Sequence, residues 1–202
     1  MINNLQDIIE QRCWSGDVAA VVHSIEARLC RQMNLGKAET VGSQIRFTRL
    51  QSRVFNHADF FRTEENNRFT GKHLIVQGAT SAGKTLVSEI AVLDTLRCNK
   101  NALVLVPLKS MVRERYTRFR DDFSASRNYR VYASSGDYLD YDEELLKGKY
   151  DVAVMVYEKL FAMLCRPGCS ILDDCGLIVV DELSMLEVEA RGPKLEIAIQ
   201  KA

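Results

Sequence analysis

Residues 78–85 constrain the fold more strongly than any other part of this sequence. They read Gly-Ala-Thr-Ser-Ala-Gly-Lys-Thr and fit the pattern GxxxxGK[ST]. An apolar run at residues 73–77 precedes them, and an amphipathic segment with Leu86, Ile90 and Leu93 follows. A strand, a glycine-containing loop and a helix in this order are the setting in which such a loop binds phosphate. The pattern therefore predicts a phosphate-binding loop in an α/β fold.

Further apolar runs support this fold class. They lie at residues 102–107, 129–133, 152–156 and 177–180, and are rich in valine, isoleucine and leucine. Nearly continuous apolar character is typical of strands that are buried on both faces of a parallel sheet. The segments between the runs are long enough for crossover helices. We expect five parallel strands, counting 73–77, with helices between them.

The N-terminal part is expected to be helical. Residues 5–33 carry two apolar stripes, separated by a break at Gly16 and Asp17, and Trp14 is predicted to pack between the two helices. Residues 44–61 predict a further helix, and 62–71 a polar loop.

Composition narrows the class of protein. The chain has 202 residues, 47% of them hydrophobic, which is ordinary for one globular domain and argues against extensive disorder. Its 27 basic and 27 acidic residues cancel, so overall charge gives no argument for a nucleic-acid partner. The sequence shows neither a membrane-spanning run nor a signal-peptide layout, so we expect an intracellular protein without a membrane partner.

The six cysteines are expected to be reduced thiols. Cys165, Cys169 and Cys175 are close in sequence, but their spacing matches no CxxC pair. A metal site there is the less favoured alternative to small, partly buried thiols.

The glycine-containing loop has a direct physical role. Backbone N–H groups at the start of a helix attract phosphate oxygens, and Gly83 lets the backbone approach them closely. Lys84 supplies a positive charge to the terminal phosphates, and the Thr85 hydroxyl can bind Mg²⁺. The predicted nucleotide contacts are Gly78, Ala79, Thr80, Ser81, Ala82, Gly83, Lys84 and Thr85.

A second chemical signal follows the apolar run 177–180. Asp181 and Glu182 come directly after it, where parallel α/β sheets bind their ligands. Asp181 is the candidate to hold Mg²⁺ through water, and Glu182 the candidate to orient and deprotonate an attacking water molecule.

Together these motifs resemble the first RecA-like domain of superfamily 2 DExH/D-box helicases. The resemblance covers residues 46–202 and is greatest to the branch of spliceosomal, exosome-associated and repair helicases. It implies a RecA-like domain at 46–202, preceded by a helical segment at 1–45. The matching stretches are Arg49-Leu50-Gln51-Ser52, residues 78–85, 106–110, 135–137, 157–160 and 181–184, and Arg191-Gly192-Pro193.

The resemblance implies roles for further residues. Gln51 would read the adenine edge of ATP, and Lys84 and Glu182 would be catalytic, with Mg²⁺ as cofactor. Single-stranded RNA or DNA would be the partner. Its expected contacts are Pro107, Lys109, Arg113, Ser135, Gly136, Asp137 and Lys159, with a solvated helix face as an equal alternative for Arg113.

Two positions depart from the family pattern. Residues 181–184 correspond to motif II of the family, which usually ends in His or Asp but here ends in Ser184. Tyr157 replaces a small hydroxyl residue that the family is expected to place near the nucleic-acid backbone. Neither change removes a residue needed for ATP hydrolysis. Both stand at positions that, in the family, couple the nucleotide state to nucleic-acid binding.

The family also has parts that this sequence lacks. The sequence contains no motif III, which reads Ser-Ala-Thr or similar in the family, and no second RecA-like domain. We therefore expect the second domain as a partner, in the same full-length chain or in another. The motif III strand would lie between the strands at 73–77 and 177–181, so we expect an incomplete sheet with two open edges and marginal stability. The sequence thus predicts the motor domain of an ATP-dependent helicase or translocase, or alternatively a non-catalytic regulatory module derived from one.

Overall fold

The computed structural model describes residues 1–33, 45–61, 73–79, 82–123, 129–189 and 192–201. The backbone divides into two units. Unit 1 comprises Met1–Arg97 and Asp121–Arg127, and unit 2 comprises Cys98–Arg120 and Asn128–Ala202.

A parallel sheet forms the centre of unit 2. The described residues form four strands: β1 (Asn101–Val106), β2 (Val131–Ser134), β3 (Val152–Val156) and β4 (Cys175–Val180). Their order is β2-β3-β1-β4, and all three pairings are parallel. Val104 of β1 lies opposite Val154 of β3 on one side and Val179 of β4 on the other. The predicted α/β fold with a parallel sheet is confirmed.

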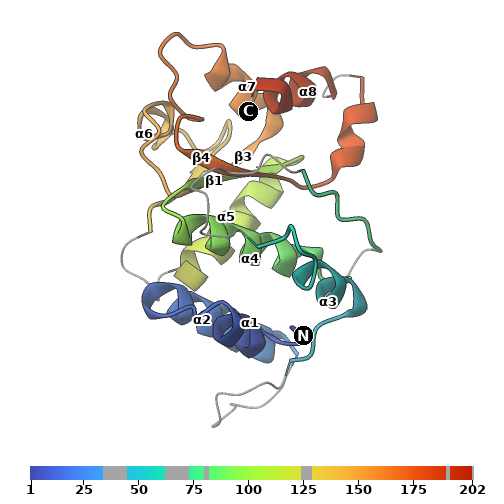
Figure 1. The fold of residues 1–202 in the computed structure, drawn as a ribbon. Helices are drawn as coiled ribbons and strands as arrows, with labels where there is room; N and C mark the ends of the chain where they lie inside the picture. The colour runs from blue at the N-terminus through green and yellow to red at the C-terminus, as the bar shows by residue number, and fades with distance from the viewer. Residues whose placement is uncertain (34–44, 62–72, 80–81, 124–128, 190–191, 202) are drawn as a thin grey trace. The chain divides into compact units, whose positions relative to one another are not determined.

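Helices cover both faces of this sheet (Figure 1). Helices α6 (Asp142–Leu146), α7 (Tyr157–Leu164) and α8 (Gly192–Lys201) contribute to a core built on β1 and β3. Helix α5 (Lys109–Phe123) lies on the opposite face. The innermost strands are apolar because both of their faces are buried, whereas β4 is half-buried along its whole length.

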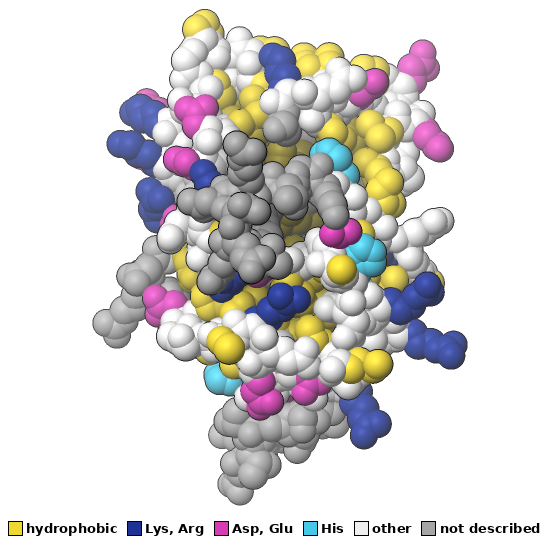
Figure 2. Space-filling model, viewed as in Figure 1, with side chains coloured by type: hydrophobic (Ala, Val, Ile, Leu, Met, Phe, Trp, Pro, Cys, Tyr) yellow, Lys and Arg dark blue, Asp and Glu magenta, His cyan; other side chains and the backbone are white. Residues whose placement is uncertain are grey.

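The short 3₁₀ helix η1 (Leu183–Glu187) follows β4 and precedes α8. Hydrophobic side chains reach the surface over these two elements (Figure 2). They are Leu183, Leu186, Val188 and Ile197, each exposed by more than a third.

Unit 1 is helical. It contains α1 (Leu5–Gln11), α2 (Gly16–Gln32), α3 (Arg49–Phe55) and α4 (Lys84–Arg97). The side chain of Asn4 caps α1, and α2 buries Val21, Val22 and Ile25. Trp14 between α1 and α2 is buried and meets the Phe61 ring edge-on, so its predicted packing role is confirmed.

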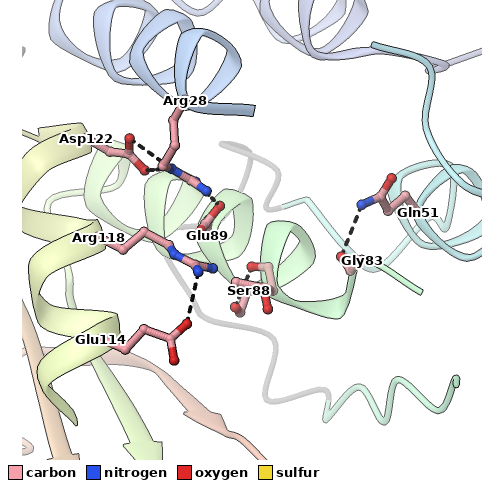
Figure 3. A network of polar contacts seen from close by, with 9 residues as sticks. Arg28, Gln51, Gly83, Ser88, Glu89, Glu114, Arg118 and Asp122 are labelled. Carbon is pink, nitrogen blue, oxygen red and sulfur yellow. Dashed lines mark hydrogen bonds and ion pairs between the residues drawn. The ribbon is translucent and has the colours of Figure 1, made fainter. Parts of the chain in front are cut away.

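A buried ion-pair network connects the helices of unit 1 (Figure 3). The Arg28 guanidinium of α2 lies 2.8 Å from the Glu89 carboxylate of α4 and 2.9 Å from that of Asp122. Both carboxylates are at most 4% exposed, and the guanidinium compensates the charge of each. Arg28 therefore attaches the N-terminal helices to the helix that follows the glycine-containing loop.

Two predictions about unit 1 are wrong. The predicted helix at 44–61 is shorter, because Thr48 and Gln51 form a capping box that begins α3 at Arg49 and Asn56 ends it. Residues 73–77 form no strand, and Leu74 and Ile75 are 45% and 77% exposed. An apolar run becomes a strand only when a neighbouring strand supplies backbone partners, and none of the described strands pairs with it. The loop predicted at 62–71 lies outside the described residues.

No helix in the described part of the chain is long and apolar enough to cross a membrane. No group of three or more His, Cys, Asp or Glu side chains there could hold a metal ion. None of the six cysteines, all of which are described, forms a disulfide.

Candidate functional site

The glycine-containing loop of unit 1 leads directly into α4, which begins at Lys84. Gly83 has φ +83°, a conformation that favours glycine, and a Cβ there would lie 2.1 Å from the Gln51 amide nitrogen. The Lys84 ammonium donates to the carbonyl oxygens of Gly78 and Ala79, at 2.6 and 2.9 Å. The lysine therefore folds back over the loop. The predicted contacts Thr80 and Ser81 lie outside the described residues.

The start of α4 has the properties of a phosphate site. The helix is 14 residues long and its first turn carries no acidic residue. Its first N–H groups lack intrahelical partners and carry the positive end of the helix dipole. With Lys84 and Thr85 at that end, the residues present fit an anionic polyphosphate and a divalent cation.

Gln51 is placed against this loop (Figure 3). Its side-chain N–H donates to the Gly83 carbonyl at 3.1 Å, and its Oε1 accepts from the Thr48 N–H at 2.9 Å. The Thr48 hydroxyl donates to the Ala82 carbonyl at 2.9 Å. Gln51 and Thr48 thus brace two consecutive carbonyls of the loop. Thr48 was not predicted as a site residue, although its spacing to Gln51 is a readable capping-box signal.

A cavity of about 590 Å³ lies on the same helix. It is lined by Phe47, Arg49, Ser52 and Arg53, so it combines an aromatic ring with two cations. These residues surround Gln51 in the sequence.

In unit 2, Asp181 is held at three points. Its N–H donates to the Leu105 carbonyl at 2.9 Å, and its carboxylate lies 2.7 Å from the Arg115 guanidinium. Its own carbonyl oxygen accepts a hydrogen bond from the Tyr157 hydroxyl. Glu182, which follows, is exposed and has φ +62°, an uncommon conformation for a residue with a side chain. Its side chain is therefore presented at the end of β4.

Arg115 and Tyr157 were not predicted to contact Asp181. They lie 66 and 24 residues from it in the sequence. Such contacts depend on how strands and helices are arranged in the fold, so no local sequence pattern predicts them.

The predicted nucleic-acid residues of unit 2 partly converge. Pro107, Lys109, Gly136 and Lys159 line one cavity of about 620 Å³, which we call the groove. The other lining residues are Leu108, Ser110, Val156, Glu158 and Ala162.

Hydrogen bonds and ion pairs organise the rim of the groove. Lys109 pairs with Asp137 at 3.1 Å, and Lys159 pairs with Asp142 at 2.5 Å. Ser135 is buried, and its hydroxyl accepts from the Asp137 N–H. Arg113 is exposed on α5 and does not line the groove.

The structure also gives the positions of two residues from the family-like stretches at 181–184 and 191–193. Ser184 lies exposed on η1. Gly192 is buried at the start of α8, where a Cβ would lie 2.0 Å from the Leu186 carbonyl oxygen. The glycine is thus required by close packing of α8 against η1.

Comparison with protein-family models identifies the chain. The model of the DEAD/DEAH box helicase family matches residues 48–202. The chain belongs to this family. The predicted resemblance to superfamily 2 helicases is therefore confirmed, and the sheet of unit 2 is that of a DEAD/DEAH box helicase domain.

Individual relatives of the chain within the DEAD/DEAH box helicase family are much longer than the chain. It is 39% identical to the ATP-dependent DNA helicase Hel308 of Thermococcus kodakarensis over 130 residues, 64% of this chain and 11% of that protein. It is 36% identical to Hel308 of Caldivirga maquilingensis over 132 residues, 65% of this chain and 17% of that protein. The Pyrococcus abyssi Hel308 is also 36% identical, over 64% of this chain and 18% of that protein. The chain thus spans less than a fifth of each of these relatives.

Proposed function

We propose that the chain is part of the ATP-dependent motor of a nucleic-acid helicase or translocase, with the RecA-like domain at 46–202 and an N-terminal helical segment at 1–45. The observation that carries the proposal is the loop before α4. There Gly83 allows close backbone approach, Lys84 is folded over two loop carbonyls, and Thr48 and Gln51 brace the loop. These contacts support the proposal that the loop binds a chain of phosphates.

The proposed chemistry assigns a separate task to each residue. In unit 1, backbone N–H groups at residues 78–85 and the Lys84 ammonium would bind the phosphates, and Thr85 would be a ligand of Mg²⁺. In unit 2, Asp181 is a further candidate ligand of Mg²⁺. When bound, Mg²⁺ neutralises charge that develops on the phosphate oxygens during transfer. Glu182 orients a water molecule and accepts its proton. Gln51 would reach the adenine edge by exchanging its bond to Gly83.

The groove of unit 2 is proposed to hold one strand of nucleic acid. Lys109 and Lys159 supply charge, and the absence of a side chain at Gly136 leaves room for the Lys109 ammonium, which a Cβ would approach to 2.7 Å. Such contacts bind phosphate without reading sequence. The relatives compared above are DNA helicases by name, which favours single-stranded DNA over RNA as the ligand. A second RecA-like domain would complete the motor.

One observation favours the alternative of a non-hydrolysing module. The Asp181 carboxylate, which would hold Mg²⁺, is already paired with Arg115. If that pair persists when nucleotide is present, the chain would bind ATP without hydrolysing it.

Glu182→Gln distinguishes the two functions. We expect the variant to bind Mg²⁺-ATP within about twofold of the parent, because Lys84 and the loop bind the phosphates, and to lose hydrolysis, because an amide accepts no proton. Equilibrium titration and phosphate release, with single-stranded DNA and the second domain supplied, measure the two properties. Phosphate release by the variant at the parent rate would place the base elsewhere. A parent that binds ATP without releasing phosphate would support the regulatory module.

A further inference from the structure

The Tyr157 hydroxyl makes a long-range contact that the proposed function has not used. Tyr157 is the first residue of α7, directly after β3, and its side chain is completely buried. Its hydroxyl donates to the backbone carbonyl of Asp181, directly after β4. Strand β1 lies between β3 and β4, so the tyrosine reaches across the end of β1.

The length of the side chain matters for this contact. Two steps between neighbouring strands amount to about 9–10 Å. A serine or threonine hydroxyl extends only one carbon atom beyond the backbone and would not reach a carbonyl two strands away. The tyrosine that replaces the family's small hydroxyl residue therefore makes a bond which the small residue does not make.

The carbonyl that accepts this bond belongs to the peptide unit between Asp181 and Glu182. Rotation of that unit changes φ of Glu182, which at +62° lies in the left-handed region. A residue with a side chain remains there only when its surroundings hold it. On the other side, the Asp181 N–H is fixed to the Leu105 carbonyl at 2.9 Å. The Tyr157 hydroxyl therefore restrains the rotation of this peptide unit and, through it, the backbone conformation of Glu182.

The same turn of α7 also faces the groove. Lys159 lies two residues after Tyr157, and Val156, Glu158 and Lys159 line the groove. The Lys159 ammonium pairs with Asp142 at 2.5 Å, and the other oxygen of Asp142 accepts from the Ser134 hydroxyl at 2.6 Å. A phosphate bound in the groove would compete with Asp142 for Lys159. Any resulting shift of the first turn of α7 moves Tyr157 with it.

We propose that Tyr157 is a positioning residue that couples occupation of the groove by a nucleic-acid strand to the conformation of the Asp181–Glu182 peptide. The inference rests on the proposed function, because it needs both ligands. The coupling is reciprocal: bound nucleotide and magnesium change the affinity for the strand by the same factor as the strand changes theirs.

The test is a binding cycle on Tyr157→Phe, which keeps the ring and removes the hydroxyl. Tyr150→Phe is a matched control. Tyr150 is equally buried, its hydroxyl donates to the Ile171 carbonyl at 2.7 Å, and burial raises its pKa, so it too is a neutral donor to a backbone carbonyl. Fluorescent oligo(dT) is titrated into each protein with and without the magnesium complex of a non-hydrolysable ATP analogue.

The expected results separate this inference from the proposed function. In the parent and in Tyr150→Phe, the analogue should change oligo(dT) affinity by about fivefold or more. In Tyr157→Phe that factor should fall to within about 1.5-fold of unity. A parent that binds neither ligand overturns the proposed function and the inference with it. A parent that binds both without coupling, or a Tyr157→Phe variant that retains the factor, overturns the inference alone.

A second measurement needs no variant. Hydrogen exchange of the parent should change at residues 182–188 when oligo(dT) binds, because a shift of Tyr157 alters the hydrogen bond to the peptide before them. Unchanged exchange there, in a sample in which oligo(dT) binding is saturated, would overturn the coupling even if Tyr157→Phe failed to fold.

Discussion

Gly83 and Gly192 show how much a single position can depend on the absence of a side chain. At Gly83 both a positive φ and the Gln51 amide exclude a Cβ, whereas at Gly192 the neighbouring Leu186 carbonyl alone does so. The first lies in a loop proposed to bind phosphate, and the second in the packing of α8 on η1. The same residue type is thus proposed to serve a ligand at Gly83 and serves packing at Gly192.

Gly192→Ala should therefore destabilise the fold without affecting nucleotide binding. We expect a loss of about 1–3 kcal/mol in the free energy of unfolding, the usual cost of overpacking a tight site. Denaturant titration measures it. The control Lys194→Ala, on the exposed side of the same helix, should change stability by about 0.5 kcal/mol or less. Equal stability of both variants would show that η1 yields to the new methyl group.

At this scale the sequence predicted motif residues but not their partners. Gly83, Lys84, Asp181 and Glu182 follow from short patterns with fixed spacing, and the structure places each of them at the expected end of a helix or strand. The contacts of Asp181 with distant side chains could not be predicted, because they depend on which strands become neighbours.

At the scale of helices, α2 is joined to α4 by charge as well as by apolar packing. Arg28→Met should cost about 3 kcal/mol or more of stability, because Glu89 and Asp122 would lose the cation that compensates them in a buried site. Thermal and denaturant unfolding measure the loss. Arg31→Met, an exposed position on the same helix, should be nearly neutral. A neutral Arg28→Met would mean that the network contributes little.

Helices α5 and α7 carry Lys109 and Lys159, the two lysines that line the groove. The salt dependence of oligo(dT) affinity tests whether these lysines contact phosphates. Each phosphate contact on a single strand contributes a slope of about −0.7 to the dependence of log affinity on log salt concentration. Lys109→Ala and Lys159→Ala should each flatten the slope for oligo(dT) by about that amount. Arg166→Ala removes an exposed charge outside the groove and should leave the slope unchanged. Equal salt-dependence slopes for all three variants would mean that the oligo(dT) strand binds outside the groove.

Strand prediction succeeded where burial on both faces produced a continuous apolar run, as at Val152–Val156, whose bounds agree with the structure. It failed at residues 73–77, where the same composition is exposed. An apolar run indicates that a segment tends to be buried. It does not indicate whether a neighbouring strand can pair with that segment. The helix around Gln51 was overestimated because the capping box at Thr48 was not recognised as its beginning.

At the scale of the whole molecule, each unit contains its own set of candidate residues. The glycine-containing loop and its braces belong to unit 1, and the Asp181–Glu182 pair and the groove belong to unit 2. Strand β4 pairs with β1 alone among the described strands, so its other edge can accept a further strand. The family match extends over both units, from residue 48 to 202.

The most direct test of the account is calorimetric titration of Mg²⁺-ATP into the parent and into Lys84→Ala. Lys84 supplies the only side-chain cation within residues 78–85, so its removal should weaken affinity at least tenfold, about 1.4 kcal/mol. Lys100→Ala removes a half-buried lysine outside the loop, which pairs with Asp174, and should bind as the parent does. Equal affinities for the parent and Lys84→Ala would contradict the phosphate cradle and the motor function built on it.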